Sequence, residues 1–477
     1  MLQSLQGLKN RLGSSPHGRA QRRRLVCRAA AQAADSVTDE LLAVLEAYTS
    51  LADAARVETS LELRRTGGAL GAGLGLATTR PHAKNEVLMR VPRSAAIVLD
   101  YDRGLSMPPA RWPRLRGGVS SSTDPLPWDI LIALALVDGL AGDGGEFWSR
   151  YCDALLPAPE RLTLPMCWEP QRLAHLQHRD IAAAAEAQQD RLMGLFPELM
   201  EPLAPDVPSW IQWAFACVRS RAFRAGPDAF AFVPFLDLAN HADAPQAGPP
   251  PGPGGGAGAG AQAGPSVPPA NHVANADFRA SPPSSGSGEA AAGEYFELYA
   301  LRDIEPGEEV TISYAGPKGY TNQRFMAQYG FVPVGGNAAD RVQLELAPEL
   351  QAAPLDLAVL QALLGDGLFL AALNGSDPYL NAALRSLPLA DGGSGGEEGR
   401  TASAASVRTA QALLEQVEAQ IAAGTTTLEA DEALMGGPQG AALAAADPRQ
   451  AAAVSYRIER KRLLGKAAAV LRAYARQ

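Results

Sequence analysis

Three polar residues, Asp237, Asn240 and His241, form the group in this chain that is best placed to do chemistry. They directly follow an apolar run, Phe232 to Leu236, which predicts a buried strand that ends at the polar group. A carboxylate, an amide and an imidazole held by a rigid element can bind and orient a small polar molecule. The alternative is a turn whose side chains bond only their own backbone, because Asn and Asp favour such turns.

Two other stretches could contribute to such a site. Upstream, the glycine-rich loop from Gly67 to Arg80 would let the backbone approach a ligand closely. The alternative is that these glycines only form ordinary turns. No strand, loop and helix unit follows it, which excludes a dinucleotide-binding motif. Downstream, the alternating run from Val310 to Tyr314 predicts a strand with the Tyr314 hydroxyl at its buried end. A core tyrosine with a locally bonded hydroxyl is the alternative there.

A helix that begins near Ser209 predicts a buried cation. Ser209 and Gln212 have capping-box spacing, and Ala214, Cys217 and Val218 then form an inward stripe that also carries Arg221. A buried guanidinium needs an anion nearby, because an unpaired buried charge is very unfavourable. The anion is either Asp237, in an internal salt bridge, or a bound ligand.

Composition narrows the class of protein. At 477 residues the chain is long enough for two or three domains, and its net charge of −9 is spread out, which argues against nucleic-acid binding. No apolar run approaches the ~20 residues that span a bilayer, so no membrane segment is expected. Four scattered cysteines indicate neither a zinc cluster nor a disulfide framework, and no metal is predicted.

The N-terminus has the composition of a targeting sequence. Residues 1–34 contain seven Lys and Arg but no Asp or Glu, which predicts an organelle transit peptide, with a basic tail as the alternative. The segment Leu25 to Ala31 resembles a stromal cleavage site.

The remaining chain alternates between strand-rich and helical regions, an α+β pattern. A lead-in helix is expected over Thr38 to Leu51, short strands to Leu99, helices over 125–223, and helices again from Arg341, with a linker at 391–408. Residues 246–293 contain 11 Gly and 9 Pro among 48 positions, which predicts a disordered loop. A second Asn-His pair, Asn271 and His272, lies in that loop and follows no strand.

Taken together, the motifs resemble the SET-domain protein methyltransferases, in particular the Rubisco large-subunit lysine methyltransferase type. The resemblance covers roughly residues 60–477 and rests on the Gly-Leu-Gly loop, the Asn-His pair, and a Gly-Glu-Glu-Val-x-Ile-x-Tyr strand followed by Tyr-Gly-Phe. It implies a β-rich SET domain over 35–340, with a helical insertion at about 110–223. An all-helical substrate-binding domain over 341–477 would follow.

The resemblance also assigns site residues. It implies that Ala72, Gly73 and Leu74 contact S-adenosylmethionine, with Ala72 acting only through its backbone. Arg221 and Ser220 would meet the methionine moiety, so the resemblance favours a ligand carboxylate as the anion. The other implied cofactor contacts are Asp237, which braces the turn, Asn240, His241, Tyr314 and Tyr329, and Tyr314 is also the expected catalytic residue.

The implied activity is protein-lysine N-methylation of a folded non-histone protein in the chloroplast stroma. The Rubisco large subunit and chloroplast aldolase are the expected partners, and a monomer is expected. Two alternatives stay open: a protein-histidine methyltransferase of the actin type, and a SET-like binding scaffold without turnover. The basic leader argues against the first, and the retained Asn240, His241, Tyr314 and Tyr329 argue against the second.

Overall fold

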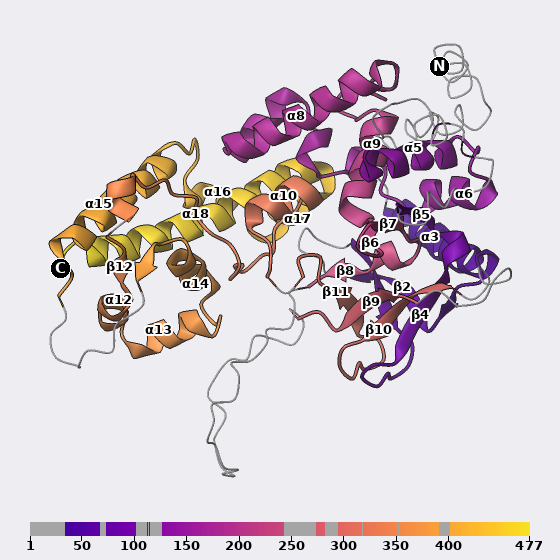
Figure 1. The fold of residues 1–477 in the computed structure, drawn as a ribbon. Coiled ribbons are helices and arrows are strands. Elements are labelled where there is room, and N and C mark those ends of the chain that lie inside the picture. Colours follow the sequence, from indigo (N-terminus) through magenta and orange to yellow (C-terminus); the bar gives the residue numbers. More distant parts are fainter. Residues whose placement is uncertain are drawn as a thin grey trace, which may run out of the picture.

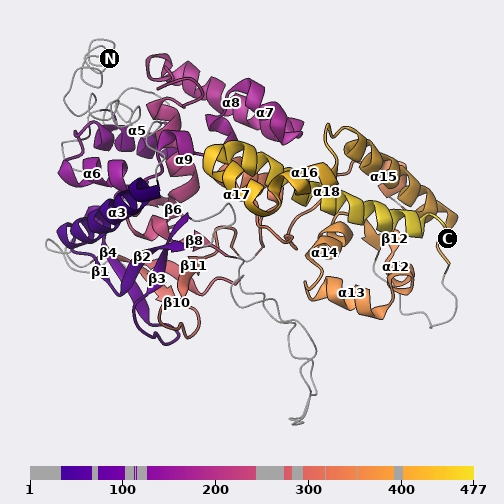
Figure 2. The ribbon, with the colours of Figure 1, turned by 180° about the vertical axis from the view of Figure 1, so that it is seen from behind.

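The computed structural model describes residues 34–66, 73–101, 112, 114, 126–242, 273–281, 294–316, 318–351, 353–390 and 401–477. These ranges form a mixed lobe of strands and helices and a second lobe of helices, and the last helix runs between them (Figures 1 and 2). Residues 1–33 of the expected transit peptide and the pair Asn271 and His272 lie outside the described residues, and Ala34 begins α3.

Three small sheets build the mixed lobe. The first has the order β1 (Glu58–Thr59), β4 (Val87–Pro92), β10 (Tyr295–Ala300) and β9 (Ala276–Ala280). The second has the order β2 (Leu61–Thr66), β3 (Gly73–Thr78), β11 (Glu309–Ile312) and β8 (Asn240–His241). The third has the order β5 (Ile97–Asp100), β7 (Ala229–Phe232) and β6 (Phe223–Arg224).

The helices of this lobe are α3 (Ala34–Ala54), α5 (Trp128–Leu140), α6 (Glu146–Ala154), α7 (Pro170–Leu173), α8 (Arg179–Leu195), α9 (Trp210–Arg221) and α10 (Asn322–Tyr329). Helix α3 contacts β2 and α5 contacts β5 and β7, whereas α8 contacts α9 and α10. Helix α9 begins with the expected capping box, since Ser209 accepts from the Gln212 N–H and Gln212 accepts from the Ser209 N–H. No described helix is both long and apolar enough to cross a bilayer.

The helical lobe has its own apolar core, which extends from Val342 to Tyr474. Its elements are α11 (Pro348–Gln351), β12 (Leu355–Asp356), α12 (Leu357–Leu364), α13 (Asp366–Leu373), α14 (Pro378–Arg385), β13 (Leu389–Ala390), α15 (Ala404–Ala422), α16 (Leu428–Met435), α17 (Gly437–Ala446) and α18 (Pro448–Tyr474). Helix α18 also enters the core of the mixed lobe, where Tyr456 is buried.

Two expectations from the sequence are wrong. The strand expected over Phe232 to Leu236 ends at Phe232, because Phe235 has a φ of 69° and Leu236–Leu238 form a 3-10 helix. The disorder expected over 246–293 is wrong for 273–281, where strand β9 (Ala276–Ala280) pairs with Phe296 to Ala300 of β10, and the rest of that stretch lies outside the described residues. Backbone pairing and the burial of Ala276 order this segment despite the composition around it.

Candidate active site

Strand β11 brings the predicted site segments together. It pairs with β3 through Val310 and Leu76, and in parallel with β8 through Thr311 and Asn240. The glycine-rich segment and the Asn-His pair, 166 residues apart at Leu74 and Asn240, therefore lie on either side of one strand.

Asn240 ties these segments to each other. Its Nδ2 lies 3.1 Å from the Leu74 carbonyl oxygen, 2.8 Å from Glu309 Oε1 and 3.2 Å from Thr66 Oγ1. All three acceptors are distant in sequence, so the side chain does not make the purely local turn that was the alternative.

His241 lies in an aromatic cluster. Its Nδ1 accepts a hydrogen bond of 3.2 Å from the Tyr314 backbone N–H. The ring centroids of Phe325, Tyr314 and Phe331 lie 4.8, 5.1 and 6.0 Å from that of His241. Burial lowers the pKa of His241 to about 4, so the imidazole is neutral at physiological pH.

Tyr314 and Tyr329 pack against each other, with ring centroids 4.9 Å apart. The Tyr314 hydroxyl donates to the Ala239 carbonyl oxygen at 2.8 Å, and the Tyr329 hydroxyl donates to the Tyr314 carbonyl oxygen at 3.4 Å. Burial raises the pKa of Tyr314 to about 12. The Tyr314 hydroxyl therefore keeps its proton and acts as a hydrogen-bond donor next to the Asn-His segment.

Arg221 and Asp237 form the internal salt bridge that was one of the two alternatives. Arg221 Nη1 lies 3.2 Å from Asp237 Oδ2 and 3.0 Å from the Asp237 carbonyl oxygen. Burial raises the pKa of the Asp237 carboxyl, and the charge of Arg221 partly offsets this. The Asp237 side chain is 0% exposed but that of Arg221 is 26% exposed, so part of the Arg221 side chain is accessible.

The other predicted site residues differ in how they are placed. The Ser220 hydroxyl donates a hydrogen bond of 2.8 Å to the Ala216 carbonyl oxygen, so in this structure it bonds within helix α9. A Cβ added at Gly73 would meet no described atom within 4 Å, which leaves room beside that backbone. Ala72 lies outside the described residues.

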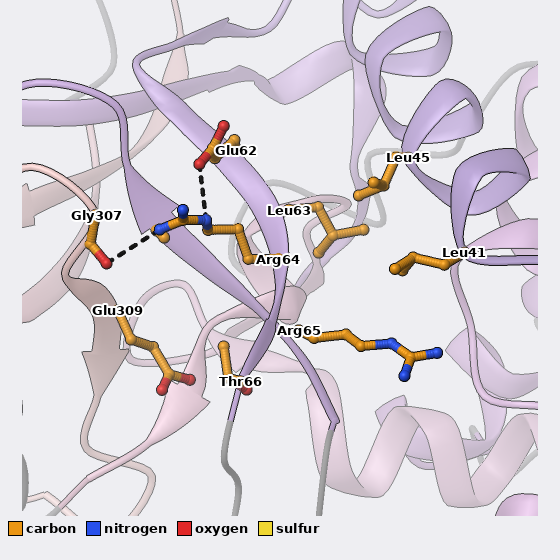
Figure 3. A pocket seen from close by; sticks show the side chains of 10 residues that line it. Leu41, Leu45, Glu62, Leu63, Arg64, Arg65, Thr66, Gly307 and Glu309 are labelled. Atoms are coloured by element: carbon orange, nitrogen blue, oxygen red, sulfur yellow. Dashed lines mark hydrogen bonds and ion pairs between the residues drawn. The ribbon is translucent and has the colours of Figure 1, made fainter. Parts of the chain in front are cut away.

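A surface pocket of about 600 Å³ adjoins this group (Figure 3). It lies between α3 and the sheet edge, and its lining comprises Leu41, Leu45, Glu62, Leu63, Arg64, Arg65, Thr66, Ala77, Gly307 and Glu309. The pocket shares Thr66 and Glu309 with the surroundings of Asn240 but does not include His241, Tyr314 or Arg221. No cluster of His, Cys, Asp or Glu suited to a metal ion occurs in the described ranges.

Three residues that support the site were not predicted from the sequence. Thr66 and Glu309 hold the Asn240 amide, and Tyr151 of α6 donates a hydrogen bond to Asp237. The sequence signal for Glu309 was its place as the second Glu of the Gly-Glu-Glu-Val motif. No local pattern marks Tyr151.

Comparison with known proteins gives consistent but distant relatives. No family profile matches the chain. Mouse SET domain-containing protein 4 is 25% identical over 291 residues, which is 55% of this chain and 53% of that protein. The tobacco chloroplastic ribulose-1,5 bisphosphate carboxylase/oxygenase large subunit N-methyltransferase is 28% identical over 184 residues, which is 36% of this chain and 34% of that protein. The chain thus spans about half or less of the curated relatives it matches.

Solved structures match over most of the chain. The SET domain of LSMT bound to lysine and AdoHcy has a TM-score of 0.52 at 19% identity, and the match covers 90% of this chain and 91% of that one. Rubisco LSMT bound to sinefungin and monomethyllysine has a TM-score of 0.51 at 19% identity, over 90% and 91% of the two chains. The chain therefore has the α+β fold of the SET-domain proteins, in the form that includes a helical C-terminal region.

Proposed function

We propose that this protein is an S-adenosylmethionine-dependent protein-lysine N-methyltransferase that acts on a folded chloroplast protein. The observation that carries the proposal is the convergence of Gly73 and Leu74, Asn240 and His241, and Tyr314 around β11. The fold match to LSMT structures with lysine and AdoHcy bound supports the same chemistry.

The residues fit such a cofactor. Open space beside Gly73 allows close approach to the backbone, and the exposed part of Arg221 suits a carboxylate. The neutral His241 ring and the Tyr329 ring offer an apolar surface for a heterocycle. S-adenosylmethionine, when bound, supplies an electrophilic methyl group.

Tyr314 is the proposed catalytic residue. A lysine must be neutral to accept a methyl group, although its ordinary pKa is ~10.4, so a site that excludes water is needed. The protonated Tyr314 hydroxyl, held by the Ala239 carbonyl oxygen, can orient the amine and respond to the charge that develops on it.

The compartment and the substrate complete the proposal. The acid-free leader over 1–34 and the chloroplastic relative from tobacco support residence in the stroma. The Rubisco large subunit and chloroplast aldolase are the first candidate substrates, and the helical region over 341–477 is the proposed docking domain.

Two measurements test this function. Calorimetry with S-adenosylmethionine should show weaker binding for Asn240→Ala and Arg221→Ala but near-normal binding for Tyr314→Phe, which should mainly slow turnover. Asn374→Ala, at an exposed position, is the control. Labelled cofactor and a stromal extract should then yield methyl-lysine. Methyl-histidine would reassign the product, and normal cofactor affinity in both binding variants would overturn the site.

A further inference from the structure

Glu309 lies where strands β3 and β8 meet β11, and the proposed function assigns it no role. It is on β11, the central strand between β3 and β8, and pairs there with Ala77 of β3. Its Oε1 accepts from Asn240 Nδ2 at 2.8 Å, the shortest of the three contacts of that amide group. Figure 3 shows the same side chain at the wall of the pocket, near Thr66.

The three acceptors determine how the amide is oriented. An Asn NH₂ group has two N–H donors, whereas its oxygen only accepts. Leu74, Thr66 and Glu309 all present oxygen atoms on one side, and an ionised carboxylate is the strongest acceptor among them. The NH₂ group must therefore face Glu309, which leaves the Asn240 oxygen on the opposite side as an acceptor.

The backbone next to this contact leaves no space for another atom. A Cβ at Gly75 would lie 2.5 Å from Asn240 Nδ2, 2.7 Å from Glu309 Oε1 and 2.8 Å from Thr66 Cγ2. By contrast, a Cβ at Gly73, two residues earlier on β3, would meet no described atom within 4 Å. The glycine at position 75 thus makes room for the contact between Asn240 and Glu309.

We propose that Glu309 is a positioning residue for cofactor binding. Its carboxylate fixes the orientation of the Asn240 amide, and the amide in turn holds the Leu74 carbonyl, so one side chain sets the distance between the two cofactor-binding segments. The inference rests on the proposed function, since it assigns Glu309 a role in that site. Glu309 acts through Asn240 and needs no contact of its own with substrate or cofactor.

Two substitutions of Glu309 test this role. Glu309→Ala removes the charged acceptor and should raise the Kd and KM for S-adenosylmethionine about tenfold or more, with a much smaller change in kcat. Glu309→Gln keeps an oxygen that can accept from Asn240 and should restore most of the affinity. The matched control is Glu62→Ala, because Glu62 lines the same pocket but pairs with Arg64.

The outcomes separate this inference from the proposed function. If the unmodified protein does not bind S-adenosylmethionine, the function itself fails. If it binds and Glu309→Ala binds equally well, the positioning role is overturned. An equal loss in the Ala and Gln variants, together with a lower melting temperature in both, would assign Glu309 a purely structural role and also overturn the proposal. A loss confined to Glu309→Ala, with an unchanged melting temperature, supports it.

Discussion

Tyr151 and Asp237, which are 86 residues apart, are joined by a buried hydrogen bond from the hydroxyl to the carboxylate. The same hydroxyl accepts from the Phe235 backbone N–H at 2.8 Å. Phe235 has a positive φ of 69°, which is strained for a residue with a bulky side chain. Helix α6, which carries Tyr151, therefore stabilises the strained turn that leads into the Asn-His segment.

Removal of the Tyr151 hydroxyl should destabilise the fold. We expect Tyr151→Phe to lower the free energy of unfolding by about 1–3 kcal/mol, because a buried carboxylate and a buried N–H each lose a partner. Denaturant unfolding measures this loss. Tyr48→Phe is the control, since the buried Tyr48 hydroxyl makes a longer bond of 3.4 Å to the Leu61 carbonyl oxygen. Equal losses in the two variants would contradict the special role of Tyr151.

Asp340 should make stability depend on pH. Burial raises its pKa from 3.8 to about 6, so the folded protein holds this proton more tightly than the unfolded chain does. The stability contributed by Asp340 is therefore present below about pH 3.8 and is lost as the pH rises through 6. Asp340→Asn lacks this titration and can still accept from the Asn322 N–H.

The variant should accordingly gain stability relative to the unmodified protein between pH 4 and pH 7. The gain is expected to reach at most about 3 kcal/mol, because each tenfold change in proton affinity is worth about 1.4 kcal/mol. Melting temperatures across this pH range give the difference, with the exposed Asp53→Asn as the control. A difference that is flat with pH would show that Asp340 does not titrate in this way.

Gly330 should tolerate no side chain. It ends α10 with a φ of 75°, and a Cβ there would overlap the backbone of Thr163. Gly316 has a similar φ of 62°, but a Cβ there would meet no described atom within 4 Å. Gly316→Ala should cost about 1 kcal/mol for the backbone alone, whereas Gly330→Ala should cost several times more. Similar melting temperatures for the two variants would refute this expectation.

The Gly/Pro-rich segment should contain one part that is dispensable for stability and one part that stability requires. Replacement of 246–272 by a short Gly/Ser linker should change stability by less than about 1 kcal/mol, because closure entropy depends weakly on loop length. Asn275→Ala should instead cost about 1–3 kcal/mol. Its side chain donates to the Glu309 carbonyl oxygen at 2.8 Å and accepts from the Thr311 N–H at 2.9 Å. Melting curves of the two variants give the two stability changes, and a similar change in both would contradict the prediction.

Local patterns predicted the regular elements well. The capping box at Ser209 depends on residues close in sequence and is found as expected. The motifs also identified Asn240, His241 and Tyr314, which the structure brings together.

Long-range contacts account for what could not be predicted. Strand β9 is ordered by pairing with β10, although the average composition of its surroundings predicts disorder. Tyr151 and Glu309 gain their roles only when distant segments meet at Asp237 and Asn240. For Arg221 the sequence allowed two anions, and the structure supplies Asp237 while part of the side chain stays exposed.

Helix α18 places Tyr456 in the core of the mixed lobe and Tyr474 in the core of the helical lobe. Truncation of the chain near Arg341 would therefore remove the buried α18 residues of the mixed lobe core as well as the whole core of the helical lobe. The two lobes cannot be exchanged between related proteins as independent modules, and heat should melt them in a single transition. A chimaera that is meant to change substrate preference would have to keep the first half of α18 with the mixed lobe.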